Sequence, residues 1–200
     1  MPLGANKAAI MGVAGVSTAD VVLLYDTDHS NVSAVAITSG ITSTYTEYIF
    51  GFYNVNPATD GADFQFQVNA SGESGYNETI TSTWFQVYHG VTAGDTSLSY
   101  GATLDQAQGT GYNHIGNNLG YESDEHLVGK LHLFNPASTT YVKHFYARTA
   151  YSYFDSSSSG DYAFGSFPAG YINTTGAITG INFKMSTGNF DGTVKMWGVK

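Results

Sequence analysis

The sequence predicts an all-β fold: a two-sheet antiparallel sandwich of jelly-roll type, preceded by an extended N-terminal arm. Apolar and polar residues alternate with a period of two in several runs, as they do in strands that bury one face. No window as long as an ordinary helix shows a helical period. Charged residues make up only 12 % of the chain, about half the usual share, and strands can cover their outer face with Thr, Ser, Gln and Asn instead.

Alternating runs predict the individual strands, and their spacing indicates roughly eight or nine strands in total. In chain order, the clearest runs are residues 45–53, 64–69, 79–89, 127–133, 141–146, 181–185 and 194–199. The residues that we expect in the core are Phe64, Phe66, Phe85, Leu131, Leu133, Phe183 and Met196.

Segments rich in Gly, Asn, Asp, Ser and Pro separate these runs and predict turns. Residues 186–192 carry Asn, Asp and Gly, and we expect them to form a hairpin loop between the last two strands. Residues 91–125 show the weakest alternation and few apolar anchors. They are therefore expected to be a long excursion between strands that carries a binding function.

The chain divides into an apolar N-terminal arm, residues 1–29, and a β-sandwich domain, residues 30–200. The arm contains the apolar runs 10–16 and 21–24 and lacks the charged face of a solvated helix. Alone it would expose hydrophobic surface, which favours association. We therefore expect contact with another subunit to order this arm.

Charge and cysteine content exclude several classes of function. The formal net charge is −9 and the seven Lys and Arg residues are scattered, whereas binding to phosphates or to anionic lipid requires clustered cations. We expect neither a nucleic acid nor a membrane as partner. The chain has no cysteine, which excludes disulfides and thiolate metal sites.

Histidines and acidic loops are the only candidates for a metal site. His132 and His144 fall on adjacent predicted strands, and residues 124–126 (Asp-Glu-His) resemble a ligand cluster. Residues 26–29 and 60–63 each place two carboxylates close together, as calcium sites do. Hydrogen-bonded histidines and Asp-capped turns explain the same residues, so we assign no metal ligand and no cofactor.

Enzymatic signatures are weak. A retaining glycosidase needs two carboxylates about 5 Å apart, and no signal pairs Glu47 with Glu78, the glutamates nearest to predicted strands. The G-x-S-x-G pattern is absent, because residues 72–75 are one position short of it. The sequence therefore indicates a protein without catalytic residues.

Tyrosines are abundant in the C-terminal half and are the remaining functional signal. Such side chains stack on sugar rings or anchor protein interfaces, although strand propensity also explains them. The residues concerned are Tyr141, Tyr146, Tyr151, Tyr153, Tyr162 and Tyr171.

From about residue 30 onward, the chain resembles a group of structural proteins of tailed, mostly marine, bacteriophages, in particular head decoration and fibre-type proteins. The segments that carry the resemblance are 43–50 (STYTEYIF), 56–64 (NPATDGADF), 129–136 (GKLHLFNP), 143–145 (KHF), 183–189 (FKMSTGN) and 192–199 (GTVKMWGV). Residues 1–29 and Lys200 are outside it.

The resemblance implies a non-enzymatic virion protein on the outer surface of the particle, such as a head decoration, a knob or a fibre-base component. It further implies self-association, as a trimer, and contact with the major capsid protein. The alternative that the residues leave open is a carbohydrate- or host-receptor-binding β-sandwich module that uses the exposed tyrosines, with a host glycan as partner.

Overall fold

The computed structural model describes residues 20–155 and 160–200, and these residues form thirteen strands and no helix. All strand pairs are antiparallel and fall into two sheets that pack face to face. The predicted all-β fold and the two-sheet antiparallel sandwich are therefore confirmed. The described chain holds no helix that could span a membrane.

Sheet A has nine strands and sheet B has four. In spatial order, the strands of sheet A are β1 (Val21–Val32), β13 (Phe190–Val199), β3 (Glu47–Pro57), β9 (Leu127–Phe134), β10 (Lys143–Asp155), β11 (Gly160–Ile172), β5 (Ile80–Gly90) and β6 (Thr96–Tyr100), with β7 (Ala107–Gly109) also paired to β5. The strands of sheet B are β2 (Ala34–Ile37), β12 (Ile178–Met185), β4 (Ala62–Ala70) and β8 (Asn113–Leu119).

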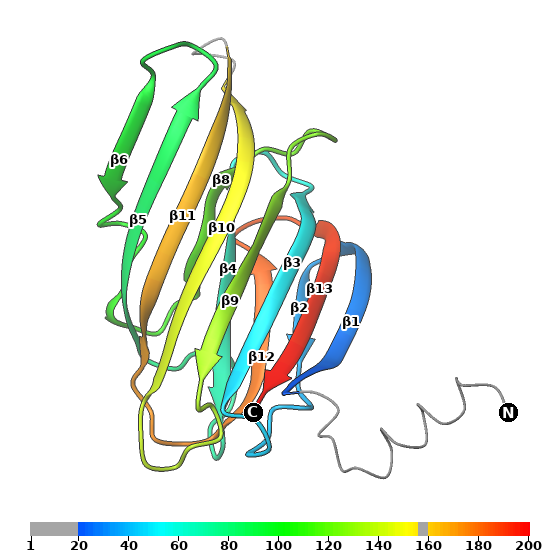
Figure 1. Ribbon diagram of the computed structural model, residues 1–200, viewed down its shortest axis with the longest axis vertical. Coiled ribbons are helices and arrows are strands. Elements are labelled where there is room, and N and C mark those ends of the chain that lie inside the picture. Colours follow the sequence, from blue (N-terminus) through cyan, green and yellow to red (C-terminus); the bar gives the residue numbers. More distant parts are fainter. Residues whose placement is uncertain (1–19, 156–159) are drawn as a thin grey trace, which may run out of the picture.

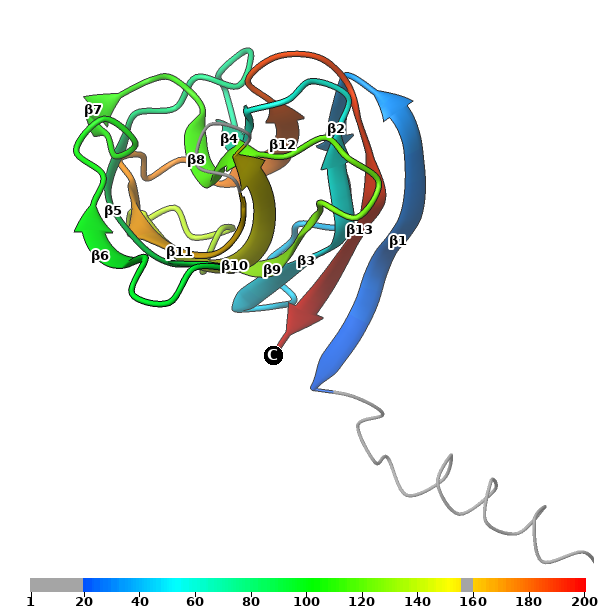
Figure 2. The ribbon, with the colours of Figure 1, turned by 90° about the horizontal axis from the view of Figure 1, so that it is seen from above.

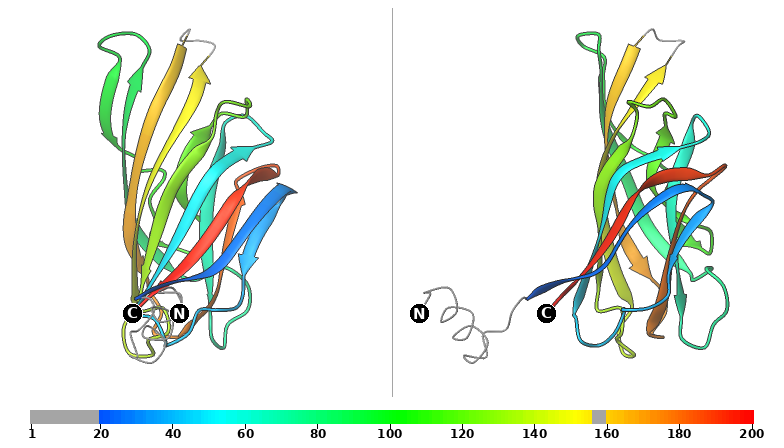
Figure 3. Two further views of the ribbon diagram at one scale, coloured as in Figure 1. Left: turned by 45° about the vertical axis from the view of Figure 1, so that its right-hand side comes forward. Right: turned by 90° about the vertical axis from the view of Figure 1, so that its right-hand side faces the viewer.

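Eight of the strands pair in a nested order along the chain. The first of them, β1, pairs with the last, β13, and β2 pairs with β12. Inside these, β3 pairs with β9 and β4 pairs with β8. The other strands, β5–β7 and β10–β11, are inserted between members of this set and extend sheet A. Their far ends project beyond sheet B (Figures 1 and 3).

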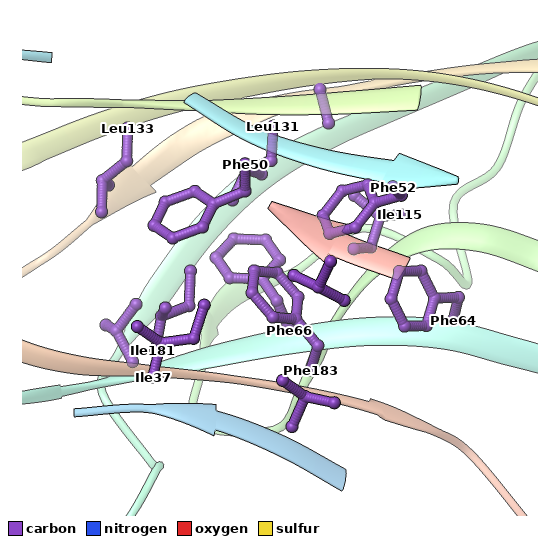
Figure 4. Packing of buried hydrophobic residues seen from close by; sticks show 14 of the residues in the cluster. Ile37, Phe50, Phe52, Phe64, Phe66, Ile115, Leu131, Leu133, Ile181 and Phe183 are labelled. Atoms are coloured by element: carbon purple, nitrogen blue, oxygen red, sulfur yellow. The ribbon is translucent and has the colours of Figure 1, made fainter. Parts of the chain in front are cut away.

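Phenylalanines from both sheets meet in the core (Figure 4). Phe183 of β12 lies 5.1 Å from Phe52 and 5.5 Å from Phe50, both on β3, measured between ring centroids. Phe64 of β4 contacts the same group, 5.2 Å from Phe52. Six of the seven predicted core residues are buried, namely Phe64, Phe66, Leu131, Leu133, Phe183 and Met196.

The prediction for Phe85 is wrong, because its side chain points out of the sandwich and is 42 % exposed. The neighbouring Trp84 points inward instead and is fully buried. Both residues are large and apolar, so the alternation of β5 does not by itself say which side is buried, and a shift of one residue exchanges the two faces.

The prediction of a long excursion at residues 91–125 is also wrong, because this segment contains β6, β7 and β8. Ile115 and Leu119 of β8 are fully buried in the core. Thr149 of β10 donates a hydrogen bond of 2.6 Å to the carbonyl oxygen of Ile115, which ties β8 to the inner face of sheet A. Pairing with β4 therefore makes a strand from a segment with few apolar residues.

Two further boundaries need correction. Residues 186–192 do not close a hairpin, since β12 belongs to sheet B and β13 to sheet A, so this segment crosses between the sheets. The arm was expected to end at residue 29, yet β1 (Val21–Val32) pairs with β13 over most of its length. The boundary between arm and domain thus falls inside a strand, and residues 1–19 lie outside the described residues.

Candidate interaction surface

The outer face of sheet A, the side turned away from sheet B, collects most of the exposed apolar side chains. Twelve large hydrophobic residues are exposed in the described part of the chain. Nine of them lie on this face, which we call face A: Val21, Leu23, Tyr53, Phe85, Val87, Leu98, Tyr100, Val128 and Tyr146. Large exposed apolar patches mark interaction sites in other proteins, so face A is the candidate interaction surface.

Strand pairing explains one end of face A. β5 and β6 pair so that Phe85 lies opposite Tyr100 and Val87 lies opposite Leu98. Residues directly opposite each other point to the same side of a sheet, so all four side chains face outward together. The ring of Phe85 also stacks on Phe167 of β11, with centroids 4.9 Å apart and planes 10° apart.

A second aromatic group lies on β9 and β10. The ring of His132 stacks on Tyr146 at 4.5 Å with an interplanar angle of 14°, and Phe134 lies 5.7 Å from Tyr146. His132 is also hydrogen-bonded through Nδ1 to the carboxylate of Glu47 on β3. His144 contacts Tyr171, at 6.0 Å between ring centroids, and His132 lies opposite Tyr146 in the strand pairing, so the two histidines do not face each other as predicted.

Two cations lie side by side in the middle of face A. Lys130 of β9 and Arg148 of β10 are directly opposite each other in the pairing, and like charges in this position destabilise a sheet. Within the described residues, neither forms an ion pair. The guanidinium of Arg148 lies 5.5 Å from the ring centroid of Phe167. Among the described residues, face A therefore holds two cations without an ion pair beside its apolar side chains, in a chain of net charge −9.

The acidic segments considered for calcium have ordinary protein partners. In β1, Asp26 forms an ion pair with Lys195 at 3.0 Å, and Asp28 accepts a hydrogen bond from Thr193. Asp63 accepts a hydrogen bond of 2.9 Å from the backbone of Asn118. Across the described residues, no group of three or more His, Asp and Glu side chains is arranged to hold a metal ion.

The remaining acidic candidates are separated in the fold. Glu125, from the predicted Asp-Glu-His cluster, is buried and accepts a hydrogen bond of 3.1 Å from the backbone of Glu122. Glu78 lies between β4 and β5, and its carboxylate accepts a hydrogen bond of 2.8 Å from the backbone of Ala70. Glu47 lies on face A beside His132, so Glu47 and Glu78 do not form the facing pair that a glycosidase uses.

The six C-terminal tyrosines do not form one platform. Tyr146 lies on face A, whereas Tyr151 points into the sandwich and is hydrogen-bonded to Ser166 at 3.0 Å. Burial raises the pKa of the Tyr151 hydroxyl. Tyr162 donates a hydrogen bond of 2.7 Å to Asp95, and Tyr141 lies in the connection before β10. The tyrosine content predicted exposed aromatic groups but not their division between the two faces.

Sequence reasoning missed face A because it assigned Phe85 to the core. The missed signal is the apolar content of both sides of β5, where Trp84 and Phe85 are adjacent.

Comparisons with models of known families, with curated proteins and with solved structures found no match.

Proposed function

We propose that this protein is a non-enzymatic structural component on the outside of a tailed-phage particle, a head decoration, knob or fibre-base protein, and that face A is its assembly surface. The observation that carries the proposal is the concentration of exposed apolar side chains on this one face. Apolar area of this kind is covered when subunits assemble. The resemblance of residues 30–199 to phage structural proteins supplies the biological setting.

The nested pairing of eight strands supports the same proposal. In a jelly roll, a long antiparallel hairpin is rolled up so that its first strand pairs with its last, its second with its second to last, and so on. The pairs β1·β13, β2·β12, β3·β9 and β4·β8 have this order. We therefore propose a jelly-roll core with β5–β7 and β10–β11 as insertions. Jelly rolls are frequent in viral capsid proteins and in lectins.

We propose that the partner on face A is another copy of this chain, in a trimer, with the major capsid protein as the attachment partner of the assembly. The unpaired cations Lys130 and Arg148 favour an acidic partner, and a second copy is acidic overall. An outer position on the particle also keeps a negatively charged protein away from packaged DNA.

The oligomeric state in solution tests this assignment. We expect the purified protein to be larger than a monomer in size-exclusion chromatography with light scattering. The double variant Phe85→Ser/Leu98→Ser removes apolar area from face A and should dissociate it. The control Tyr121→Ser/Tyr141→Ser removes exposed aromatic rings outside face A and should leave the assembly intact. A monomeric wild-type protein, or equal dissociation of both variants, would refute assembly through face A.

The location on the particle needs a separate measurement. Gold-labelled antibody to this chain should decorate the outside of intact phage particles in electron micrographs. Absence of label on intact particles would overturn the virion assignment without affecting the oligomer test.

The second candidate function, a carbohydrate- or host-receptor-binding module, is favoured by a groove on the other sheet.

A further inference from the structure

A small groove lies on the outer side of sheet B, on the opposite side of the molecule from face A. It has a volume of about 330 Å³. Its floor is formed by Asn69 of β4 with Thr179 and Gly180 of β12, and its walls by Tyr76, Glu73 and Thr38. We call it the sheet B groove. Ligand sites usually occupy about 300–1,000 Å³, so this groove suits one small ring rather than a peptide or a lipid chain.

The floor of the groove presents fixed polar groups. The side-chain amide of Asn69 donates a hydrogen bond of 3.0 Å to the hydroxyl of Thr179, which in turn donates one of 3.2 Å to the backbone oxygen of Asn69. The side-chain oxygen of Asn69 is buried and has no hydrogen-bond partner in the described chain. An orphaned acceptor is costly, but this oxygen is closed to solvent, so Thr179 is the exposed polar residue that the floor offers to a ligand.

The aromatic wall of the groove is Tyr76. A tyrosine hydroxyl is protonated and able to donate at neutral pH, and burial raises the pKa of the Tyr76 hydroxyl further. This hydroxyl packs beside the buried Gly180, where an added Cβ would lie 3.4 Å from the Tyr76 hydroxyl oxygen and 3.4 Å from the carbonyl oxygen of Ile37. The ring of Tyr76 can stack on the apolar face of a sugar ring.

The rim adds exposed acceptors and donors. Glu73 and Ser74 are exposed, and Gly75, with a φ of +89°, turns the chain so that this rim stands next to Tyr76. Glu73 is the only charged residue of the lining. A single carboxylate is too few for a metal ion, but it accepts two adjacent hydroxyl groups well.

We infer that the sheet B groove binds a neutral hexose unit of a glycan. An aromatic wall, an amide, two threonine hydroxyls and one carboxylate form the mixed polar and aromatic set that recognises a polyhydroxylated ring. The inference goes beyond assembly through face A and is independent of it, because the two surfaces lie on opposite sheets. It gives the particle protein a site for a carbohydrate.

Saturation-transfer NMR tests this inference with the full-length protein and a panel of glucose, galactose, mannose and N-acetylglucosamine. We expect transfer to at least one of these sugars. For that sugar, Tyr76→Ala should raise the Kd at least about tenfold, through loss of the ring contact and the hydroxyl donor. The conservative variants Glu73→Gln and Thr38→Val lie on the surface, leave the fold unchanged and should each weaken binding severalfold.

Tyr141→Ala is the matched control, because it removes an exposed tyrosine that is not part of the groove lining and should leave the Kd unchanged. Three results would overturn the inference: no transfer to any sugar of the panel, a Kd that none of the three groove variants changes, or a sugar signal lost in Tyr146→Ala, which would place binding on face A. None of these results bears on the oligomeric state, which is measured separately.

Discussion

The two outer faces of the sandwich differ sharply in chemistry. Face A carries nine of the twelve exposed large hydrophobic residues, and the outer face of sheet B carries none. The outer face of sheet B instead presents amide groups, hydroxyl groups and isolated charged side chains. Tyr112, for example, donates a hydrogen bond of 3.2 Å to Asn182, and the ammonium of Lys184 lies 4.7 Å from the ring centroid of Tyr112. The same fold thus offers one face suited to protein contacts and one suited to water or sugar.

An antiparallel sandwich places the two sides of each strand in different environments. Each strand has one inward side, and the inward sides of both sheets meet in one apolar core. The outward sides do not pack in this core, so their side chains suit the solvent or the partner that contacts them. Water favours the polar outer side of sheet B, whereas the apolar outer side of sheet A is favourable only when it is covered.

The largest expected effect comes from comparing the same residue type on the two sides of a sheet. Phe183→Ala removes a ring at the centre of the core and should lower the free energy of unfolding by about 3–5 kcal/mol. Phe85→Ala removes a partly exposed ring that stacks on Phe167 and should lower it by about 0.5–1.5 kcal/mol in the dissociated protein. Urea denaturation of both variants at low protein concentration measures the contrast. Similar losses would mean that face A is part of the folding core.

A smaller effect is expected where the backbone itself is crowded. A Cβ atom added at Gly129 of β9 would lie only 2.5 Å from the carbonyl oxygen of Arg148 on the paired strand β10. Gly129→Ala should therefore cost about 1–3 kcal/mol through overpacking. Gly111, in the connection between β7 and β8, has nothing within 4 Å of such an atom, so Gly111→Ala is the control. If thermal unfolding shows the same loss of stability for both variants, the close approach of the two backbones at Gly129 is not what makes alanine unfavourable there.

Sequence patterns predicted those parts of the fold in which one side of a strand is clearly apolar. β4 is the best case, because Phe64 and Phe66 alternate with Gln65 and Gln67, and both phenylalanines are fully buried as predicted. The pattern failed at β5, where Trp84 and Phe85 compete for the inward side. Period alone cannot choose between two apolar sides, and only the pairing with neighbouring strands settles the choice.

The surfaces were harder to predict than the strands. Face A joins residues from six strands of sheet A that are distant in sequence, and nothing local marks them as neighbours. The sheet B groove likewise needs the pairing of β4 with β12, which places Gly180 opposite Asn69. The edge strand β1 was placed in the arm because its first half is apolar, yet that half is the part of β1 that lies on face A.

The smallest expected effect concerns the polar end of β1, where sheet A changes from apolar to polar. The ring of His29 stacks on the ring of Tyr25, and the Tyr25 hydroxyl oxygen lies 3.1 Å from Nε2 of His29. Burial lowers the pKa of His29 below its usual value of 6.5, and the nearby Asp28 raises it in part. The neutral ring is therefore favoured in the folded state, so its contribution to stability is present above pH 6.5 and is lost as the pH falls through the folded value.

NMR titration of the His29 ring should thus give a midpoint below 6.5 in the wild-type protein. Asp28→Asn removes the opposing negative charge and should lower the midpoint further. Asp105→Asn is the control, because Asp105 accepts its hydrogen bond from Tyr100 on β6, at the opposite edge of sheet A. A midpoint above 6.5 would show that the Asp28 charge outweighs burial. The polar end of β1 would then be a charged contact surface rather than a weakly buried edge, and the boundary of face A would move along the strand.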